Sequence, residues 1–479
     1  MFGVNLVFLT AACLIAFLSP VWGFTILLLV TSTLFHLEQY LTVSLPVGYI
    51  EPTEALVITM LASVFLNRSS SVFQKREDAG SGPIRSGSGK VWPIIGPYCA
   101  WQSACVLIGL TNWAGTENFR FGIRFLLSGV LPWTSLYVLS KLSTDQGRRI
   151  FRNAYYLTLL TACTHIALQV FDNRALMKAA YYWVQQNSDQ QLWWLQGYLD
   201  EETFVRGLPQ GILLILFFTL LKLGQYGFSR RPGRIQDLLA TALLFSAMFI
   251  TITRSYVIIL ALGILAMFAL SVLGHRFNAG GTLRIAVVIA SFIGAALAYN
   301  AVRPQFLDFW SERVNAFYGE DYKIFSEENR ARGLDNIASA RAIADHPIFG
   351  LGTPSYPSEY SMRSGGATDT HPMLSVGLVG GVPAMLLIFI MQIWLILPSL
   401  RVLSRYPALA SDLLPFVSVT IMNTLAVNLS GGGGTLFGPQ ILFVTIFTNE
   451  MWNRHSFHIP GWSVMQRPRY AAVSAAVSR

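Results

Sequence analysis

PMLSVGLVGGVPAMLLIFIMQIWLILPS, residues 372–399, decides the fold class of this chain. The stretch carries no charged side chain, and about 20 consecutive apolar residues are enough to cross the hydrocarbon core of a bilayer as a helix. Apolar runs recur along the 479 residues, of which 53% are hydrophobic and 12% are charged. Soluble domains carry about 25% charged residues. The sequence therefore predicts an all-α, polytopic integral membrane protein.

Thirteen apolar runs qualify as spans, or twelve if residues 2–35 form one span that is broken at Pro20. These first residues are kept as spans because no Lys or Arg precedes the apolar run and no small-residue cleavage site follows it. The four cysteines lie within spans, at spacings that suit neither a metal site nor a disulfide framework. The expected spans are 2–19, 21–35, 52–66, 92–111, 121–140, 153–171, 209–225, 235–252, 255–273, 285–301, 372–399, 412–429 and 435–450.

The distribution of Lys and Arg predicts how the chain is oriented. One set of alternate connections, together with the tail 451–479, holds 20 basic residues, the opposite set holds 13, and Lys222 lies inside a span. Basic residues accumulate on the cytoplasmic side of membrane proteins. The net charge of +9 is therefore attributed to topology and not to a nucleic-acid partner. The Gly- and Ser-rich segment 67–91 is expected to be a cytoplasmic linker.

Residues 302–371 are the long polar segment of the chain, and the charge distribution puts them outside the membrane. Chemistry on water-soluble groups is expected there. The predicted organisation is an N-terminal membrane region at 1–301, this external loop at 302–371, C-terminal membrane helices at 372–450 and a cytoplasmic tail at 451–479.

Within the loop, residues 326–345 are expected to form a helix. Ser326 is a suitable N-cap, and Pro347 cannot continue a helix. Spacings of 4, 3 and 4 residues bring four side chains to one face of that helix, whereas Arg332 points elsewhere. The four residues are Arg330, Leu334, Ile337 and Arg341.

Arg254 and His371 are the residues best suited to chemistry. Arg254 lies between two spans at the external boundary, where it either snorkels to the interface or binds phosphate through two parallel hydrogen bonds. His371 begins a span on the same side and is either an interfacial histidine or a general base that Asp369 orients. His346 is expected to pack a turn.

Glycines mark two expected turns. Gly350 and Gly352 follow the end of the loop helix and are interpreted as turn residues. The GGGG run at 431–434 either lets a ligand approach the backbone or forms a flexible turn. The sequence contains no phosphate-binding loop, no HExxH and no nucleophile elbow. No Asp-rich metal motif is present either, so neither a metal nor a cofactor is expected.

Taken in order, these motifs resemble the O-antigen ligase and O-antigen polymerase superfamily of bacterial membrane glycosyltransferases. The resemblance covers residues 235–400 and rests on TITRSY at 251–256, a helix followed by HPIFGLG at 346–352, His371, and GLVGGVPAMLLIF at 377–389. The family pattern has an Arg about 15 residues before the Pro of its PxxGxG signature; counting back from Pro347 gives Arg332, with Arg330 as its neighbour.

The resemblance implies a glycosyltransferase at the periplasmic face of the bacterial inner membrane. The implied donor is a glycan on undecaprenyl diphosphate, whose leaving group Arg254 and Arg332, with Arg330 and Arg341 as further candidates, would bind. His371 would take the acceptor's proton. A polymerase of surface polysaccharide repeat units (O-antigen, capsule or exopolysaccharide) is favoured, with a flippase and a chain-length regulator as protein partners.

Two alternatives are kept. The first is a ligase that passes the glycan to a lipid A core. The second, from another class, is a lipid-glycan or solute transporter, against which stand the absence of visible repeats and of ionisable residues in mid-span. Residues 172–208, rich in Tyr and Trp, are either a helix on the membrane surface or a wall that guides a lipid-linked substrate.

Overall fold

A computed structural model of the whole chain shows helices that can be described in three groups, all of which contribute to one hydrophobic core. It describes residues 2–31, 43–45, 48–68, 92–112, 134–135, 137–139, 142, 144–170, 212–228, 235–250, 254–273, 279–302, 308, 311, 323–352 and 372–405. Within these residues the predicted helical architecture is confirmed. The one departure is a short antiparallel hairpin of β1 (Val43–Leu45) and β2 (Gly48–Ile50), in which Val43 pairs with Ile50.

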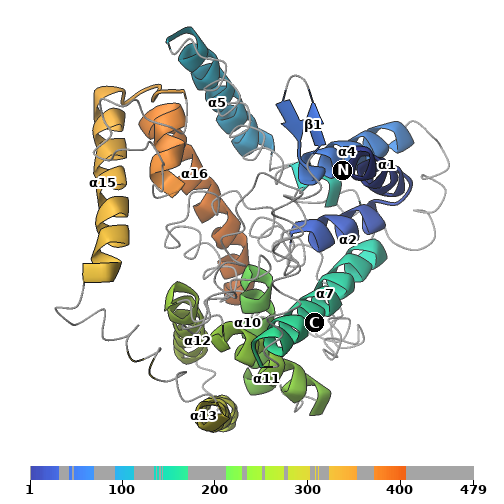
Figure 1. Cartoon of the computed structure of the whole chain (residues 1–479), viewed down its shortest axis with the longest axis vertical. Helices are drawn as coiled ribbons and strands as arrows, with labels where there is room; N and C mark the ends of the chain where they lie inside the picture. Colours follow the sequence, from blue (N-terminus) through green and yellow to red (C-terminus); the bar gives the residue numbers. More distant parts are fainter. Residues whose placement is uncertain are drawn as a thin grey trace, which may run out of the picture.

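The first group combines this hairpin with α1 (Phe2–Leu18), α2 (Pro20–Thr31) and α4 (Pro52–Arg68) (Figure 1). Helical hydrogen bonding continues across the boundary of α1 and α2. The amide of Ser19 donates to the carbonyl of Ile15 at 2.8 Å, and the amide of Gly23 donates to the carbonyl of Ser19 at 2.9 Å. Because Pro20 has no N–H to donate, residues 2–31 form two helices joined at a proline kink. The break at Pro20 is therefore where the sequence predicted it, and the number of spans stays a prediction.

The second group contains α7 (Thr144–Val170), α10 (Ile212–Phe228), α11 (Ile235–Ile250), α12 (Arg254–Leu273) and α13 (Ala279–Val302). Aromatic side chains fill the space between α7 and α10. The ring centroids of Phe151 and Phe218 lie 5.3 Å apart, and those of Tyr155 and Phe218 also lie 5.3 Å apart. Tilted and edge-on ring pairs at such distances pack favourably, so this group is held by large interlocking side chains.

The third group contains α5 (Trp92–Asn112), α15 (Lys323–Asp345) and α16 (Pro372–Arg405). In Figure 1, α15 lies beside the first part of α16, and α5 approaches the same part from the other side. α5 thus meets two helices that lie more than 200 residues later in the sequence, at one junction. This junction contains the loop motif of the sequence analysis.

Several helices extend beyond the spans expected from hydropathy. α7 begins at Thr144 although its span was expected from 153, α13 begins at Ala279 and not at 285, and α16 continues to Arg405. The reason is that backbone hydrogen bonding along a helix continues into polar residues, whereas hydropathy marks only the apolar part. The spans expected at 412–429 and 435–450, and most of 121–140, lie outside the described residues.

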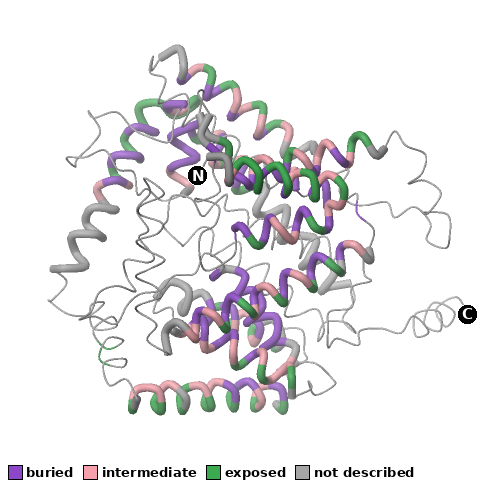
Figure 2. Tube along the Cα trace, turned by 45° about the vertical axis from the view of Figure 1, so that its right-hand side comes forward, coloured by how far each residue is buried: buried purple, intermediate pink, exposed green. Residues whose placement is uncertain are grey.

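Two described helical segments, Gly280–Ala301 and Met373–Ile390, are both long and apolar enough to cross a membrane. Six other described helices carry shorter apolar segments of 10–17 residues. α13, the lowest helix in Figures 1 and 2, exposes large apolar side chains along its length. Length and composition alone are weak evidence for spanning, because buried helices of soluble proteins satisfy the same criteria. Membrane crossing therefore remains a prediction.

Candidate functional site

The helix predicted at 326–345 corresponds to α15 (Lys323–Asp345). It ends two residues before Pro347, as predicted. The amide of His346 still donates to the carbonyl of Ala342 at 3.1 Å, so the last helical turn is completed before the chain changes direction. His346 itself is exposed. Its expected role as a turn residue is supported by this backbone geometry.

α15 packs against α16 through one face. The buried residues Ala338, Ala342 and Ile343 form a small apolar cluster with Leu351 and Leu378. By contrast, the side chain of Ile337 is 47% exposed, and Arg341 is exposed as well. Of the face predicted from the spacing of Arg330, Leu334, Ile337 and Arg341, the residues Ile337 and Arg341 are therefore turned away from α16, whereas Leu334 is half-buried.

Two polar residues lie on the buried face of α15. Asp335 is 1% exposed and Ser339 is fully buried. Arg332 precedes them by three and seven residues, spacings that bring positions on a helix to the same side. By the helical repeat, position 332 therefore lies on the same side of α15 as the buried residues Asp335 and Ser339. Position 330 lies on the opposite side.

The HPIFGLG motif forms a compact turn against α16. The amide of Gly350 donates to the carbonyl of His346 at 2.9 Å. Gly350 and Gly352 both have positive φ, 63° and 72°, a conformation that side chains with a Cβ rarely adopt. The interpretation of these glycines as turn residues is confirmed.

The turn also interrupts the hydrogen-bond ladder of α16. In a regular helix the amide of Val382 would donate to the carbonyl of Leu378, four residues earlier. Here the Val382 amide donates to the carbonyl of Pro347 at 2.8 Å, and the Leu378 carbonyl accepts from the amide of Leu351 at 2.5 Å. Gly381, between the two, has non-helical angles with φ 66°. The kink of α16 therefore follows from the insertion of the turn.

α5 closes the other side of the turn. A Cβ added to Gly352 would lie 2.5 Å from the carbonyl oxygen of Cys105 and 2.5 Å from the Cα of Gly109. Trp101 stacks on Phe349 with ring centroids 5.4 Å apart, and its Nε1 donates to the carbonyl of Gly380 at 2.8 Å. Contact at this junction is therefore largely between backbones. The sequence analysis missed the contributions of Gly109 and Trp101, for which no local pattern exists.

The residues predicted to carry chemistry are described only in part. Arg254 is the first residue of α12, which agrees with its expected position at the start of a span. The side chains of Arg254, Arg330 and Arg332, and all of His371, lie outside what the structure describes. The same holds for Asp369, for residues 172–208 and for the run at 431–434. The meeting of the two arginines therefore stays a prediction.

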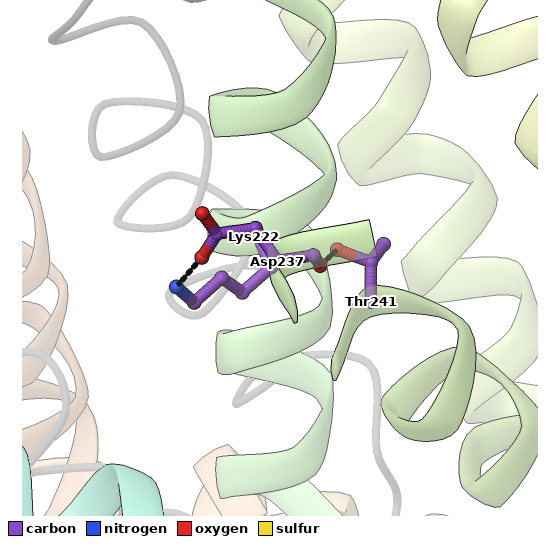
Figure 3. A network of polar contacts seen from close by, with 3 residues as sticks. All are labelled: Lys222, Asp237 and Thr241. Atoms are coloured by element: carbon purple, nitrogen blue, oxygen red, sulfur yellow. Dashed lines mark hydrogen bonds and ion pairs between the residues drawn. The ribbon is translucent and has the colours of Figure 1, made fainter. Parts of the chain in front are cut away.

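A buried ion pair lies elsewhere, between α10 and α11 (Figure 3). The ammonium of Lys222 lies 2.8 Å from Oδ1 of Asp237, and the two side chains are 2% and 16% exposed. Lys222 also lies over the ring of Tyr155, 4.8 Å from its centroid, and the Thr241 hydroxyl donates to the backbone carbonyl of Asp237 at 2.6 Å. The sequence analysis noted Lys222 inside a span but not its partner.

Glu51 is the second group that the sequence analysis missed. It lies between β2 and α4, and its amide donates to Oε2 of Glu54 at 3.2 Å. Burial, together with the nearby carboxylate of Glu54, raises the pKa of the Glu51 carboxyl to about 7. Such a carboxyl gains or loses its proton near neutral pH.

Among the residues that the structure describes, no three His, Cys, Asp or Glu side chains are grouped so that they would hold a metal ion. Comparison with protein-family models finds no family that matches this chain. Comparison with curated proteins finds no match either. The motifs and the junction of α5, α15 and α16 are therefore the basis for a functional proposal.

Proposed function

We propose that the chain is a polytopic glycosyltransferase of the bacterial inner membrane that polymerises undecaprenyl-diphosphate-linked repeat units of a surface polysaccharide at the periplasmic face. One observation carries the proposal. The loop helix, the HPIFGLG turn and the GLVGGVP segment, which together suggested the resemblance, pack into one unit in which the turn bonds into the backbone of α16. Segments that serve one reaction are expected to share such a scaffold.

The proposed reaction transfers a glycan from diphosphate to a hydroxyl. The acceptor oxygen bonds to the anomeric carbon of the donor, and the bond from that carbon to the diphosphate oxygen breaks. The electron pair of that bond leaves with undecaprenyl diphosphate, where negative charge increases. His371 takes the hydroxyl proton, because an imidazole with an ordinary pKa of about 6.5 is a suitable base near neutral pH. Neither a metal nor a nucleotide enters this balance.

Arg254 and Arg332 are proposed to bind the diphosphate. Guanidinium groups remain charged at all physiological pH values and form paired hydrogen bonds to phosphate oxygens. Cations aimed at charge that develops in the transition state lower the barrier. Arg254 begins α12, and position 332 lies on the packed side of α15 by its helical spacing. Arg330 and Arg341 are the further candidates for the same anion, and the exposure of Arg341 suits a residue reached from water.

The direct test uses the purified chain and an undecaprenyl-diphosphate-linked oligosaccharide. A ladder of longer glycans, with release of undecaprenyl diphosphate, is expected from the wild type. Arg254→Ala, Arg332→Ala and His371→Ala are each expected to lower the rate, His371→Ala by about 10²–10⁴-fold. The matched control Arg284→Ala changes a basic residue of α13 on the side expected to be cytoplasmic and should retain transfer.

Other outcomes select the alternatives. Transfer to a lipid A core with no lengthening would make the chain a ligase. Movement of the lipid-linked glycan between leaflets with no new glycosidic bond would make it a transporter. The buried Lys222–Asp237 pair is the observation that favours the transporter, because ionisable residues inside membrane helices commonly serve transport. A wild-type chain that binds the donor but forms no glycosidic bond with either acceptor would contradict the proposed function.

A further inference from the structure

We propose that the 346–352 turn, with Trp101 and Gly109 of α5, forms a set of positioning residues that fixes the C-terminal end of α15. We call this set the α15 latch. It rests on the proposed function for its purpose, since what it would position is the loop arginine on α15. Its geometry, however, stands on described contacts alone.

Between Gly109 and the turn, the α15 latch is a contact of backbone with backbone. A Cβ on Gly109 would lie 2.7 Å from the Cα of Gly352 and 2.8 Å from the carbonyl oxygen of Leu351. Contacts of this kind have no rotatable side chain that could absorb a shift. The turn and α5 therefore fit together in one arrangement, and a single methyl group at either glycine would separate them.

The turn and α16 are joined by two backbone hydrogen bonds that replace one bond within α16. The Leu378 carbonyl and the Val382 amide would bond to each other in a straight helix, and each instead bonds to the turn. When the turn leaves, α16 can straighten and restore its own bond. The turn is therefore docked when α16 is kinked at Gly381, and undocked when α16 is straight. An Ala at Gly381 would oppose the docked state, because φ 66° is unfavourable for it.

The α15 latch lies at the C-terminal end of α15. The turn begins directly after Asp345, and the buried residues of α15 continue into the same apolar cluster as Leu351 and Leu378. Position 332 lies about 20 Å along the helix from Asp345, at 1.5 Å per residue. A rigid helix transmits a small rotation at one end into a larger displacement at the other. Fixing the latch therefore fixes where position 332 lies.

A cysteine pair tests the docked state directly. The Cβ built on Gly377 lies 3.3 Å from Cγ1 of Ile343, which is near the position that the sulfur of a cysteine at 343 would occupy. It also lies 2.7 Å from Sδ of Met385, a flexible side chain that has to shift in this variant. The pair Ile343→Cys with Gly377→Cys should therefore form a disulfide under mild oxidation, and mass spectrometry of the linked peptides would identify it. Gly352→Ala or Gly381→Ala in that background should slow its formation at least tenfold.

Gly96→Ala is the matched control, because Gly96 is on the same helix as Gly109 and a Cβ there would meet nothing within 4 Å. It should change neither cross-linking nor transfer. For Gly352→Ala we expect a large loss of kcat with little change in the donor KM. The disulfide should restore kcat to this variant, since it holds α15 in place by another route. A general loss of folding would not be rescued in this way.

Two results would overturn the latch. Unchanged cross-linking in Gly352→Ala and Gly381→Ala would show that the turn does not hold α15. Loss of transfer in the cross-linked but otherwise wild-type chain would show that the reaction requires α15 to move. If the wild-type chain transfers no glycan while cross-linking still depends on Gly352, the proposed function fails and the docked geometry remains.

Discussion

Helices pack in opposite ways in two regions of the molecule. One region is the core between α7, α10 and α11, and the other is the junction of α5, α15 and α16. In the first, large side chains such as Phe218 and Lys222 fill the space and are almost fully buried. In the second, helices and turn approach through glycines, and a Cβ at Gly109 or Gly352 would overlap with the opposite backbone. Removing atoms should therefore harm the first region, and adding atoms should harm the second.

The largest expected effect is on the ion pair of the first region. Lys222→Met leaves the Asp237 carboxylate, which is 16% exposed, without its cation. Breaking a fully buried pair in this way costs about 3–5 kcal/mol, which is the upper limit for this variant. The double variant Lys222→Met with Asp237→Leu removes both charges and should recover most of that loss. Thermal unfolding of the three proteins in one detergent measures the difference. A double variant as unstable as the single one would contradict a structural ion pair.

Glu51, which follows the β1–β2 hairpin, makes the stability of the protein depend on pH. Folding raises the pKa of Glu51 from 4.5 to about 7, so the native state holds this proton more tightly than the unfolded state. The stability that the protonated Glu51 carboxyl contributes is fully present below pH 4.5 and is lost as the pH rises through 7. It amounts to at most about 3 kcal/mol. Glu51→Gln should therefore unfold at a higher temperature than the wild type at pH 8 and not at pH 4.

The control for this prediction is Asp308→Asn, which changes an exposed carboxyl. Its unfolding temperature should follow that of the wild type at both pH values. An equal gain at pH 4 and pH 8 for Glu51→Gln would show that its effect does not arise from the proton.

At the junction of α5, α15 and α16, the side chain of Trp101 is expected to contribute to stability. Trp101→Phe keeps a ring to stack on Phe349 but removes the N–H that bonds to Gly380. The expected loss is about 1 kcal/mol, the net value of one hydrogen bond. Trp101→Leu, which also removes the stacked ring, should lose more. Equal unfolding temperatures for Trp101→Phe and wild type would remove this hydrogen bond from the account.

The smallest effect is expected on the outward face of α15. Ile337 is 47% exposed, and surface substitutions away from special features usually change stability by less than about 0.5 kcal/mol. Ile337→Gln should therefore leave thermal unfolding nearly unchanged, whereas Ala338→Gln on the buried face should lower it clearly. The reverse result would mean that α15 presents its other face to α16.

Local patterns predicted the helices well because hydropathy and proline positions act within a few residues. They predicted α15, its end before Pro347 and the turn at Gly350 and Gly352. The Lys222–Asp237 pair was within reach too, since both residues lie near one short connection between neighbouring helices. The bond from Trp101 to Gly380 joins residues 279 positions apart, and no periodicity in a single sequence encodes such a contact.

The exposed face of α15 also shows what local sequence can predict and what depends on distant residues. Spacing correctly gathered Ile337 and Arg341 on one side of the helix, but it did not show that this side faces away from α16. Which face is buried depends on the partner helix, and two faces of α15 carry apolar residues. The small residues Ala338, Ser339 and Ala342 allow close approach and mark the buried side.

Labelling of single cysteines tests the central claim most directly, namely that the polar loop works outside the membrane while the tail stays inside. Ser326→Cys and Ser474→Cys, each introduced alone into a variant whose four native cysteines are replaced by Ala, would be treated with a membrane-impermeant thiol reagent in cells whose outer membrane has been made permeable. Position 326 is expected to be labelled while the inner membrane is intact, and position 474 only after the cells are lysed. Labelling of position 474 but not of position 326 would contradict the central claim.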